Sequence, residues 1–172
     1  LLIPPSTFST SVMDKINGIV IAGGPDINPS EYHEEPYTNT AIYYPEQDAS
    51  ERALIQEALD RNMPMLCVCR GMQLLSVIHG GHLHQHLDDT LDYVGHGSYD
   101  GQSSEHVVTT NEGSKIYSLM GPKVTVNSTH HQGVSDPGAL IVTAHAKHDG
   151  LIEAVERPDL RFCIGVQWHP ER

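Results

Sequence analysis

The stretch Met65-Leu66-Cys67-Val68-Cys69-Arg70-Gly71-Met72-Gln73 decides the fold of this chain. Residues 65–68 form a short apolar run, which is typical of a strand buried on both faces. Residues 72–78 then carry a helical pattern. Cys69 therefore stands at a sharp turn from strand to helix. Gly71 has no Cβ, so we expect the helix to pack closely against its neighbours at this point.

Outward from this turn, helices and buried strands alternate. Residues 18–22 form a second β-branched run, predicted to be buried on both faces, and residues 48–61 form an amphipathic helix. Residues 151–155 and 162–168 look like a terminal pair of strands. The pattern predicts the α/β class, with a mostly parallel sheet flanked by helices and an additional short strand pair.

Two smaller features accompany these elements. Asp48 followed three residues later by Glu51 is typical of a cap at the start of a helix. Residues 28–44 carry no periodicity and many Pro, Tyr, Glu and Asn residues, so we expect a long surface loop there.

Composition limits the classes of protein to consider. The chain has 172 residues, enough for one domain, predicted to comprise residues 1–172. It begins at Leu1 and ends inside a motif, so we expect both ends to be trimmed. The 22 acidic residues outnumber the 10 basic ones, giving a net charge of −12, and no Lys/Arg cluster interrupts this field. The charge therefore argues against nucleic acid as a partner.

Hydropathy and cysteine content indicate the cellular compartment of the protein. No apolar stretch approaches the roughly 20 residues that span a bilayer, so we expect no membrane association. Three cysteines (Cys67, Cys69 and Cys163) are too few for a disulfide framework and lack the spacing of a zinc site. This usage favours a reducing compartment and predicts a cytoplasmic location.

Cys69 is the candidate nucleophile. A helix N-terminus favours the thiolate, so we expect a lowered pKa for this thiol. The N–H of Arg70 would point to the oxyanion of a tetrahedral intermediate, and the Gly23-Gly24 turn could supply a second donor, Gly24. The competing interpretation is that Cys69 is a small buried apolar residue.

A thiolate nucleophile needs a base and a group that orients the base. Gln167-Trp168-His169-Pro170-Glu171 offers both just after the last predicted strand. Extended residues at i and i+2 point the same way, so Glu171 can hold the imidazole of His169.

Five blocks of sequence together carry a resemblance. Besides Cys-Arg-Gly-Met-Gln and Gln-Trp-His-Pro-Glu, they are Gly23-Gly24-Pro25-Asp26-Ile27-Asn28-Pro29, Gly80-Gly81-x-Leu83-x-Gln85-x-Leu87 and Asn127-Ser128-x-His130-His131-Gln132. The chain resembles the class I glutamine amidotransferase-like fold and, within it, the gamma-glutamyl-gamma-aminobutyrate hydrolase family.

This resemblance implies roles for particular residues. It implies that Cys69 is the nucleophile, His169 the base and Glu171 its orienter. It also implies that Gln73 helps to hold the glutamyl group, and that His130 and His131 contact substrate. Cys67 stands where the family commonly has glycine, which bears on the tightness of the turn.

Alternating His82, His84 and His86 would share one face of a strand. No carboxylate or cysteine completes a ligand set there, and the chemistry of the resembled family needs no metal. We therefore predict no metal site and no cofactor.

The predicted function is a cysteine hydrolase that cleaves gamma-glutamyl amides through a glutamyl thioester, with a small molecule as substrate. One alternative is a glutaminase subunit or domain that supplies ammonia to a synthetase. A second is a non-catalytic binding protein on the same fold. The identity of the amine and the oligomeric state, including a homodimer, stay open.

Overall fold

The computed structural model describes residues 2–3, 10–37, 43–87, 93–99 and 102–172. Three strands form its parallel part: β1 (Ile19–Ile21), β2 (Met65–Val68) and β10 (Cys163–Val166). β2 lies between the other two, with Cys67 opposite both Ile21 and Gly165. The carboxyl ends of these three strands therefore meet at one edge of the sheet.

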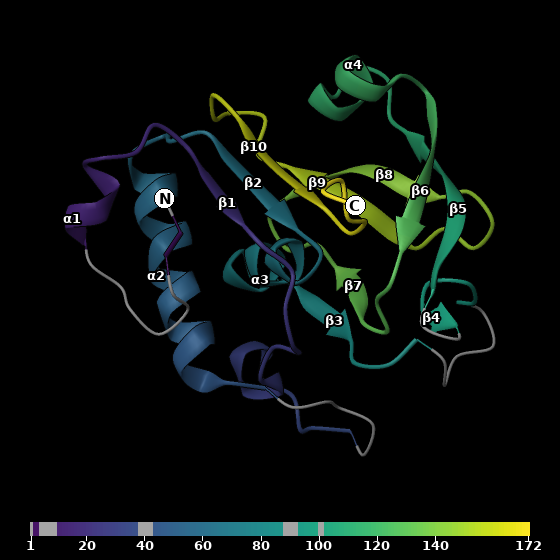
Figure 1. Ribbon diagram of the computed structural model, residues 1–172, viewed down its shortest axis with the longest axis horizontal. Coiled ribbons are helices and arrows are strands. Elements are labelled where there is room, and N and C mark those ends of the chain that lie inside the picture. Colours follow the sequence, from purple (N-terminus) through teal and green to yellow (C-terminus); the bar gives the residue numbers. More distant parts are fainter. Residues whose placement is uncertain (1, 4–9, 38–42, 88–92, 100–101) are drawn as a thin grey trace.

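The rest of the sheet is antiparallel and curls away from this part (Figure 1). Beyond β10 follow β9 (Ile152–Glu156), β8 (Ile141–Ala146), β5 (Gln102–Thr110) and β4 (Ser98–Tyr99). β6 (Lys123–Ser128) pairs with β5, and β7 (Gly133–Asp136) pairs with β3 (His82–His84) and β9.

The predicted α/β class and the terminal strand pair are confirmed, since β9 and β10 pair antiparallel. The prediction of a mostly parallel sheet is wrong. A parallel neighbour needs a long crossover, and α2 supplies one between β1 and β2. The links from β8 to β9 and from β9 to β10 contain no helix and allow only antiparallel pairing.

The helices are α1 (Thr10–Met13), α2 (Pro45–Asp60), α3 (Arg70–Ile78) and α4 (Lys115–Met120), with a 3-10 helix η1 (Pro29–Tyr32). η1 lies within the predicted loop at residues 28–44, of which residues 38–42 are outside the described residues. Among the described residues no helix is long and apolar enough to cross a membrane.

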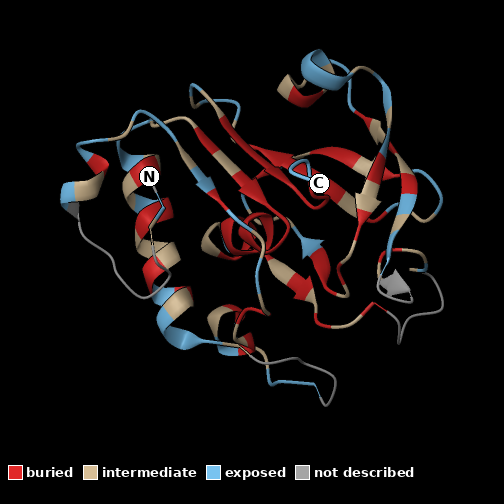
Figure 2. Cartoon of the chain, in the orientation of Figure 1, coloured by how far each residue is buried: buried red, intermediate tan, exposed pale blue. Residues whose placement is uncertain are grey.

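Buried residues concentrate on β2, β10 and α3 (Figure 2). Along β2, Met65 and Cys67 belong to one apolar cluster, whereas Leu66 and Val68 contact another. Alternation between two clusters confirms that this strand is buried on both faces. β1 differs from its prediction, because Val20 is 63% exposed. Ile21, on the opposite face of β1, is buried, so the described residues cover only one face of this strand.

Two further predictions have opposite outcomes. A Cβ on Gly71 would lie 2.5 Å from the carbonyl oxygen of Ile21, which confirms that α3 approaches β1 too closely for a side chain there. The predicted cap at Asp48 is wrong: α2 begins at Pro45, and Asp48 is fully buried inside its first turn.

Candidate active site

Cys69 connects β2 to α3 in a backbone conformation that is rare for an L-amino acid. Its φ is 50° and its ψ is −110°. Its N–H donates to the carbonyl of Val166 at 2.7 Å, which fastens the turn to the end of β10. A non-glycine residue held in such a region marks a turn that the surrounding structure enforces, as in the nucleophile elbow of hydrolases.

A pocket of about 370 Å³ opens at the carboxyl ends of the three parallel strands. Its lining consists of Ala22, Gly23, Gly24, Cys69, Thr129, His169, Glu171 and Arg172. The fold thus brings Cys69, His169, Glu171 and Gly24 together from three separate segments. Ligands in open α/β sheets commonly bind at this edge.

Within the pocket, Nδ1 of His169 lies 2.7 Å from Oε1 of Glu171. Burial raises the pKa of Glu171, but the hydrogen bond with His169, a backbone hydrogen bond and the nearby positive charges together outweigh burial and lower the pKa. An ionised Glu171 accepts the Nδ1 proton, which leaves Nε2 of His169 for proton transfer.

Gly23 separates the two principal side chains of this pocket. A Cβ built on it would lie 2.9 Å from Cε1 of His169 and 3.5 Å from Cβ of Cys69. The missing side chain therefore allows the imidazole and the thiol to flank one small space.

We expect Gly23→Ala to lower kcat by about 100-fold, because a methyl group here displaces His169. Steady-state kinetics on a gamma-glutamyl amide measures the loss, and circular dichroism checks the fold. Gly97→Ala is the matched control, since no atom lies within 4 Å of a Cβ at that glycine. Full activity of Gly23→Ala would show that the contact with His169 does not matter for turnover.

The thiol of Cys69 is protonated in this setting. Burial raises its pKa to about 11, although hydrogen bonds from the Arg70 N–H and the Gln167 side chain act in the other direction. The expectation of a lowered pKa is therefore wrong, because desolvation outweighs the helix N-terminus. Formation of the thiolate requires transfer of the proton to a neighbouring base.

Arg70 connects the start of α3 to α2. Its buried guanidinium forms ion pairs with Asp48 and Glu51 of α2. The second carboxylate oxygen of Asp48 accepts the N–H of Asn28 at 3.1 Å. Asp48 thus links the turn after β1 to the nucleophile helix, a role that the sequence did not reveal.

Gln73 lies one helical turn beyond Cys69 and is buried. Its Nε2 donates to the Gln132 carbonyl and to Oε1 of Gln167, each at 3.2 Å. Gln167 in turn directs Nε2 to the Cys69 sulfur at 3.5 Å. The side-chain amides of Gln73 and Gln167 thus form a hydrogen-bonded chain that ends at the sulfur of Cys69. Contact of Gln73 with a glutamyl group stays a prediction.

The structure gives the two predicted substrate histidines other partners. His130 is buried, and its Nδ1 lies 2.8 Å from the Gln132 carbonyl. His131 places Nε2 2.9 Å from Oδ1 of Asp26. Neither lines the pocket at Cys69, whereas the preceding Thr129 does. Their contact with substrate stays a prediction.

Asn127 belongs to one of the five sequence blocks, but no role for it was predicted from the sequence. Its Oδ1 accepts the N–H of His169 at 3.1 Å, and its Nδ2 donates to the His169 carbonyl at 3.0 Å. The side chain holds both backbone groups of His169 and thereby sets the position of the imidazole.

The parallel strands, the turn at Cys69 and the pocket at their carboxyl ends define a protein of the class I glutamine amidotransferase-like fold. The crystal structure of a glutamine amidotransferase from Methylobacillus flagellatus superposes with a TM-score of 0.64 at 18% identity, covering 95% of this chain and 55% of that one.

Sequence comparison narrows this class. The family model described as Peptidase C26 matches residues 1–171. A putative glutamine amidotransferase of Mycobacterium tuberculosis is 40% identical over the whole of this chain and 57% of its own length. The gamma-glutamyl-gamma-aminobutyrate hydrolase of Escherichia coli (strain K12) is 32% identical over 93% of this chain and 66% of its own length. The chain belongs to the peptidase C26 family, and it spans a little over half of the mycobacterial relative.

Proposed function

We propose that this protein is a cysteine hydrolase that cleaves gamma-glutamyl amides. The observation that carries the proposal is the convergence of Cys69 with the hydrogen-bonded pair His169 and Glu171 in one pocket. Membership of the peptidase C26 family supports the same reaction class. A nucleophile, a base and a group that orients the base are the parts that acyl transfer requires.

In the proposed reaction, Nε2 of His169 takes the proton of the Cys69 thiol as the sulfur attacks the side-chain carbonyl carbon of the substrate. The N–H groups of Gly24 and Arg70 stabilise the oxyanion. When the C–N bond breaks, His169 returns the proton to the departing amine, and a glutamyl thioester remains.

Hydrolysis of the thioester completes the cycle. His169 removes a proton from a water molecule, which attacks the thioester carbonyl. The C–S bond breaks, glutamate leaves, and the thiolate of Cys69 recovers the proton from His169. The buried thiol, with its pKa of about 11, makes this base necessary in the first step.

The rival function is release of ammonia from glutamine for a synthetase, and the names of the relatives include both activities. Membership of the peptidase C26 family supports the hydrolase.

We expect the protein alone to hydrolyse a gamma-glutamyl amide of a larger amine, with a kcat/KM about tenfold or more above that for glutamine. Contacts to the amine add transition-state binding that ammonia cannot make. The measurement is glutamate release from a panel that contains gamma-glutamyl-gamma-aminobutyrate, a gamma-glutamyl dipeptide, a polyglutamate and glutamine. Equal or better turnover of glutamine would favour the ammonia donor.

A further inference from the structure

A second group of titratable side chains lies outside the pocket at Cys69. His96, His106 and His130 surround Glu153, and we call these four residues the Glu153 cluster. His106 comes from β5, Glu153 from β9, and the other two from the segments that precede β4 and β7. All four are buried, and the side chain of Glu153 is fully so.

In two of these histidines, one ring nitrogen already has a hydrogen-bond partner. The carbonyl of Gln132 can only accept, so Nδ1 of His130 carries a proton and donates to it at 2.8 Å. Nε2 of His96 lies 2.7 Å from Oδ2 of Asp149, and the carboxylate fixes a proton there. The neutral form of each ring then presents a lone pair from its other nitrogen.

Those lone pairs point at a carboxylate. Nδ1 of His96 lies 3.3 Å and Nε2 of His130 lies 3.9 Å from Oε1 of Glu153. Both nitrogens, and Oε2 of Glu153, are buried without a hydrogen-bond partner. Lone pairs and an anion facing one another in a buried site need a cation between them.

A proton is the simplest cation, but it leaves one donor atom unsatisfied. Protonation of Nδ1 of His96 would join that ring to Glu153, while Nε2 of His130 would remain without a partner.

The spacing suits a metal ion. In a tetrahedral zinc site with bonds of 2.0–2.1 Å, adjacent ligand atoms lie about 3.3–3.5 Å apart. The distance of 3.3 Å from His96 lies at the lower end of this range, and the distance of 3.9 Å from His130 is longer than this range. The three donor atoms lie within 4.8 Å of one another. A histidine that ligates zinc usually donates its other N–H to a carboxylate or a backbone carbonyl, as His96 and His130 do.

We propose that His96, His130 and Glu153 bind a divalent transition-metal ion of the zinc class. His106 supports the site, because its Nε2 lies 3.0 Å from Oε1 of Glu153 and holds the carboxylate in place. Imidazole nitrogens with one carboxylate form a typical donor set for zinc.

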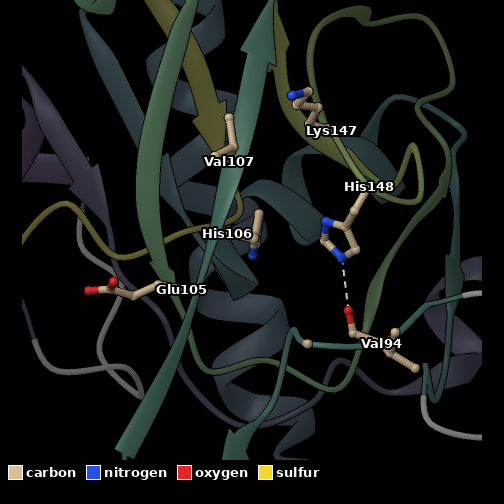
Figure 3. Close-up of a pocket in the computed structure, with 7 residues that line it drawn as sticks. Val94, Glu105, His106, Val107, Lys147 and His148 are labelled. Atoms are coloured by element: carbon tan, nitrogen blue, oxygen red, sulfur yellow. Dashed lines mark hydrogen bonds between the residues drawn. The ribbon is translucent and has the colours of Figure 1, made fainter.

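A neighbouring cavity offers a route for the ion. It has a volume of about 480 Å³, and its lining includes His106 and His148 (Figure 3). In Figure 3 the ring of His148 points to the Val94 carbonyl, which lies 2.8 Å from its Nε2. The same nitrogen lies 3.0 Å from Oδ2 of Asp149.

The ion would stabilise the framework of the pocket at Cys69. The carbonyl of Glu153 accepts the N–H of Gln167 at 2.8 Å, and the side chain of Gln167 contacts the Cys69 sulfur. A metal that fixes Glu153 therefore fixes the strand behind the nucleophile. The three ligands are buried, so the ion would be held away from bulk solvent.

The test is metal binding by the full chain after removal of bound metal with a chelator. We expect calorimetric titration to show one Zn²⁺ per chain and a rise in Tm on addition of Zn²⁺. Replacement of Zn²⁺ by Co²⁺ should produce visible absorption of a tetrahedral site without a thiolate charge-transfer band. This spectrum needs no variant, so it tests the proposal even if a buried substitution prevents folding.

Variants assign the ligands. We expect His130→Gln and Glu153→Gln each to weaken Zn²⁺ affinity by more than about 100-fold, beyond the loss typical of outer residues. His148→Gln is the matched control and should keep its affinity, although His148 and Asp149 with His96 form a second set of closely spaced donors.

Three results would overturn the proposal. The first is the absence of saturable Zn²⁺ binding by the folded chain. The second is loss of binding in His148→Gln with retention in His130→Gln, which would place the ion at the neighbouring donor set. The third is a thiolate band in the Co²⁺ spectrum, which would place it at Cys69.

Discussion

Replacing Cys69 with serine is expected to lower kcat on a gamma-glutamyl amide by about 10⁴-fold or more, the scale on which loss of a covalent nucleophile acts. A serine hydroxyl ionises far less readily than a thiol, and the burial that already raises the pKa of Cys69 to about 11 would penalise an alkoxide still more. Single-turnover kinetics would report the loss of the thioester-forming step.

The chain supplies its own matched controls for this substitution. Cys67 and Cys163 are fully buried and belong to the apolar cluster on the opposite face of the sheet from the Cys69 side chain. Cys67→Ser and Cys163→Ser should keep most of the activity of the folded protein. Iodoacetamide should label Cys69 first, because Cys69 lines the pocket. Equal labelling of all three thiols would contradict the assignment of the nucleophile.

Local sequence was sufficient to predict the turn at Cys69. The apolar run before it and the helical period after it depend on neighbouring residues only. The structure confirms that α3 packs too closely at Gly71 for any side chain. Cys67, where the resembled family commonly has glycine, causes no conflict at the turn, because its side chain is fully buried in the apolar cluster of the first face.

Long-range contacts could not be read in the same way. The direction of each strand depends on the length of its links, so the sequence predicted too much parallel pairing. The local sequence around Asp48 is typical of a helix cap, but in the structure its carboxylate forms an ion pair with the buried Arg70 of another helix. The pKa of Cys69 depends on burial by the whole fold, which no local pattern expresses.

The histidines illustrate the same limit. The sequence offers a candidate metal site only where His82, His84 and His86 alternate, and the family resemblance implies that His130 contacts substrate. The residues of the Glu153 cluster come from four separate segments, so no spacing along the chain predicts the cluster. The fold alone brings its donors together.

Loss of the base should be nearly as severe as loss of the nucleophile. We expect His169→Ala to lower kcat by about 1,000-fold or more, since Glu171, the other carboxylate or imidazole in the described lining of the pocket, has a lowered pKa and is too weak a base to take the thiol proton efficiently. His145→Ala, a histidine outside this lining, is the control and should leave kcat unchanged.

Glu171 acts through His169, so its removal should cost less. In the wild-type protein, Oε1 of Glu171 lies 2.7 Å from Nδ1 of His169, and the amide oxygen of Glu171→Gln can still accept a hydrogen bond there. The substitution removes the negative charge that stabilises an imidazolium. We therefore expect Glu171→Gln to lower kcat at least about tenfold less than His169→Ala does, with little change in KM. Near-normal turnover by His169→Ala would exclude His169 as the base, and a larger loss in Glu171→Gln than in His169→Ala would make the carboxylate itself the proton acceptor.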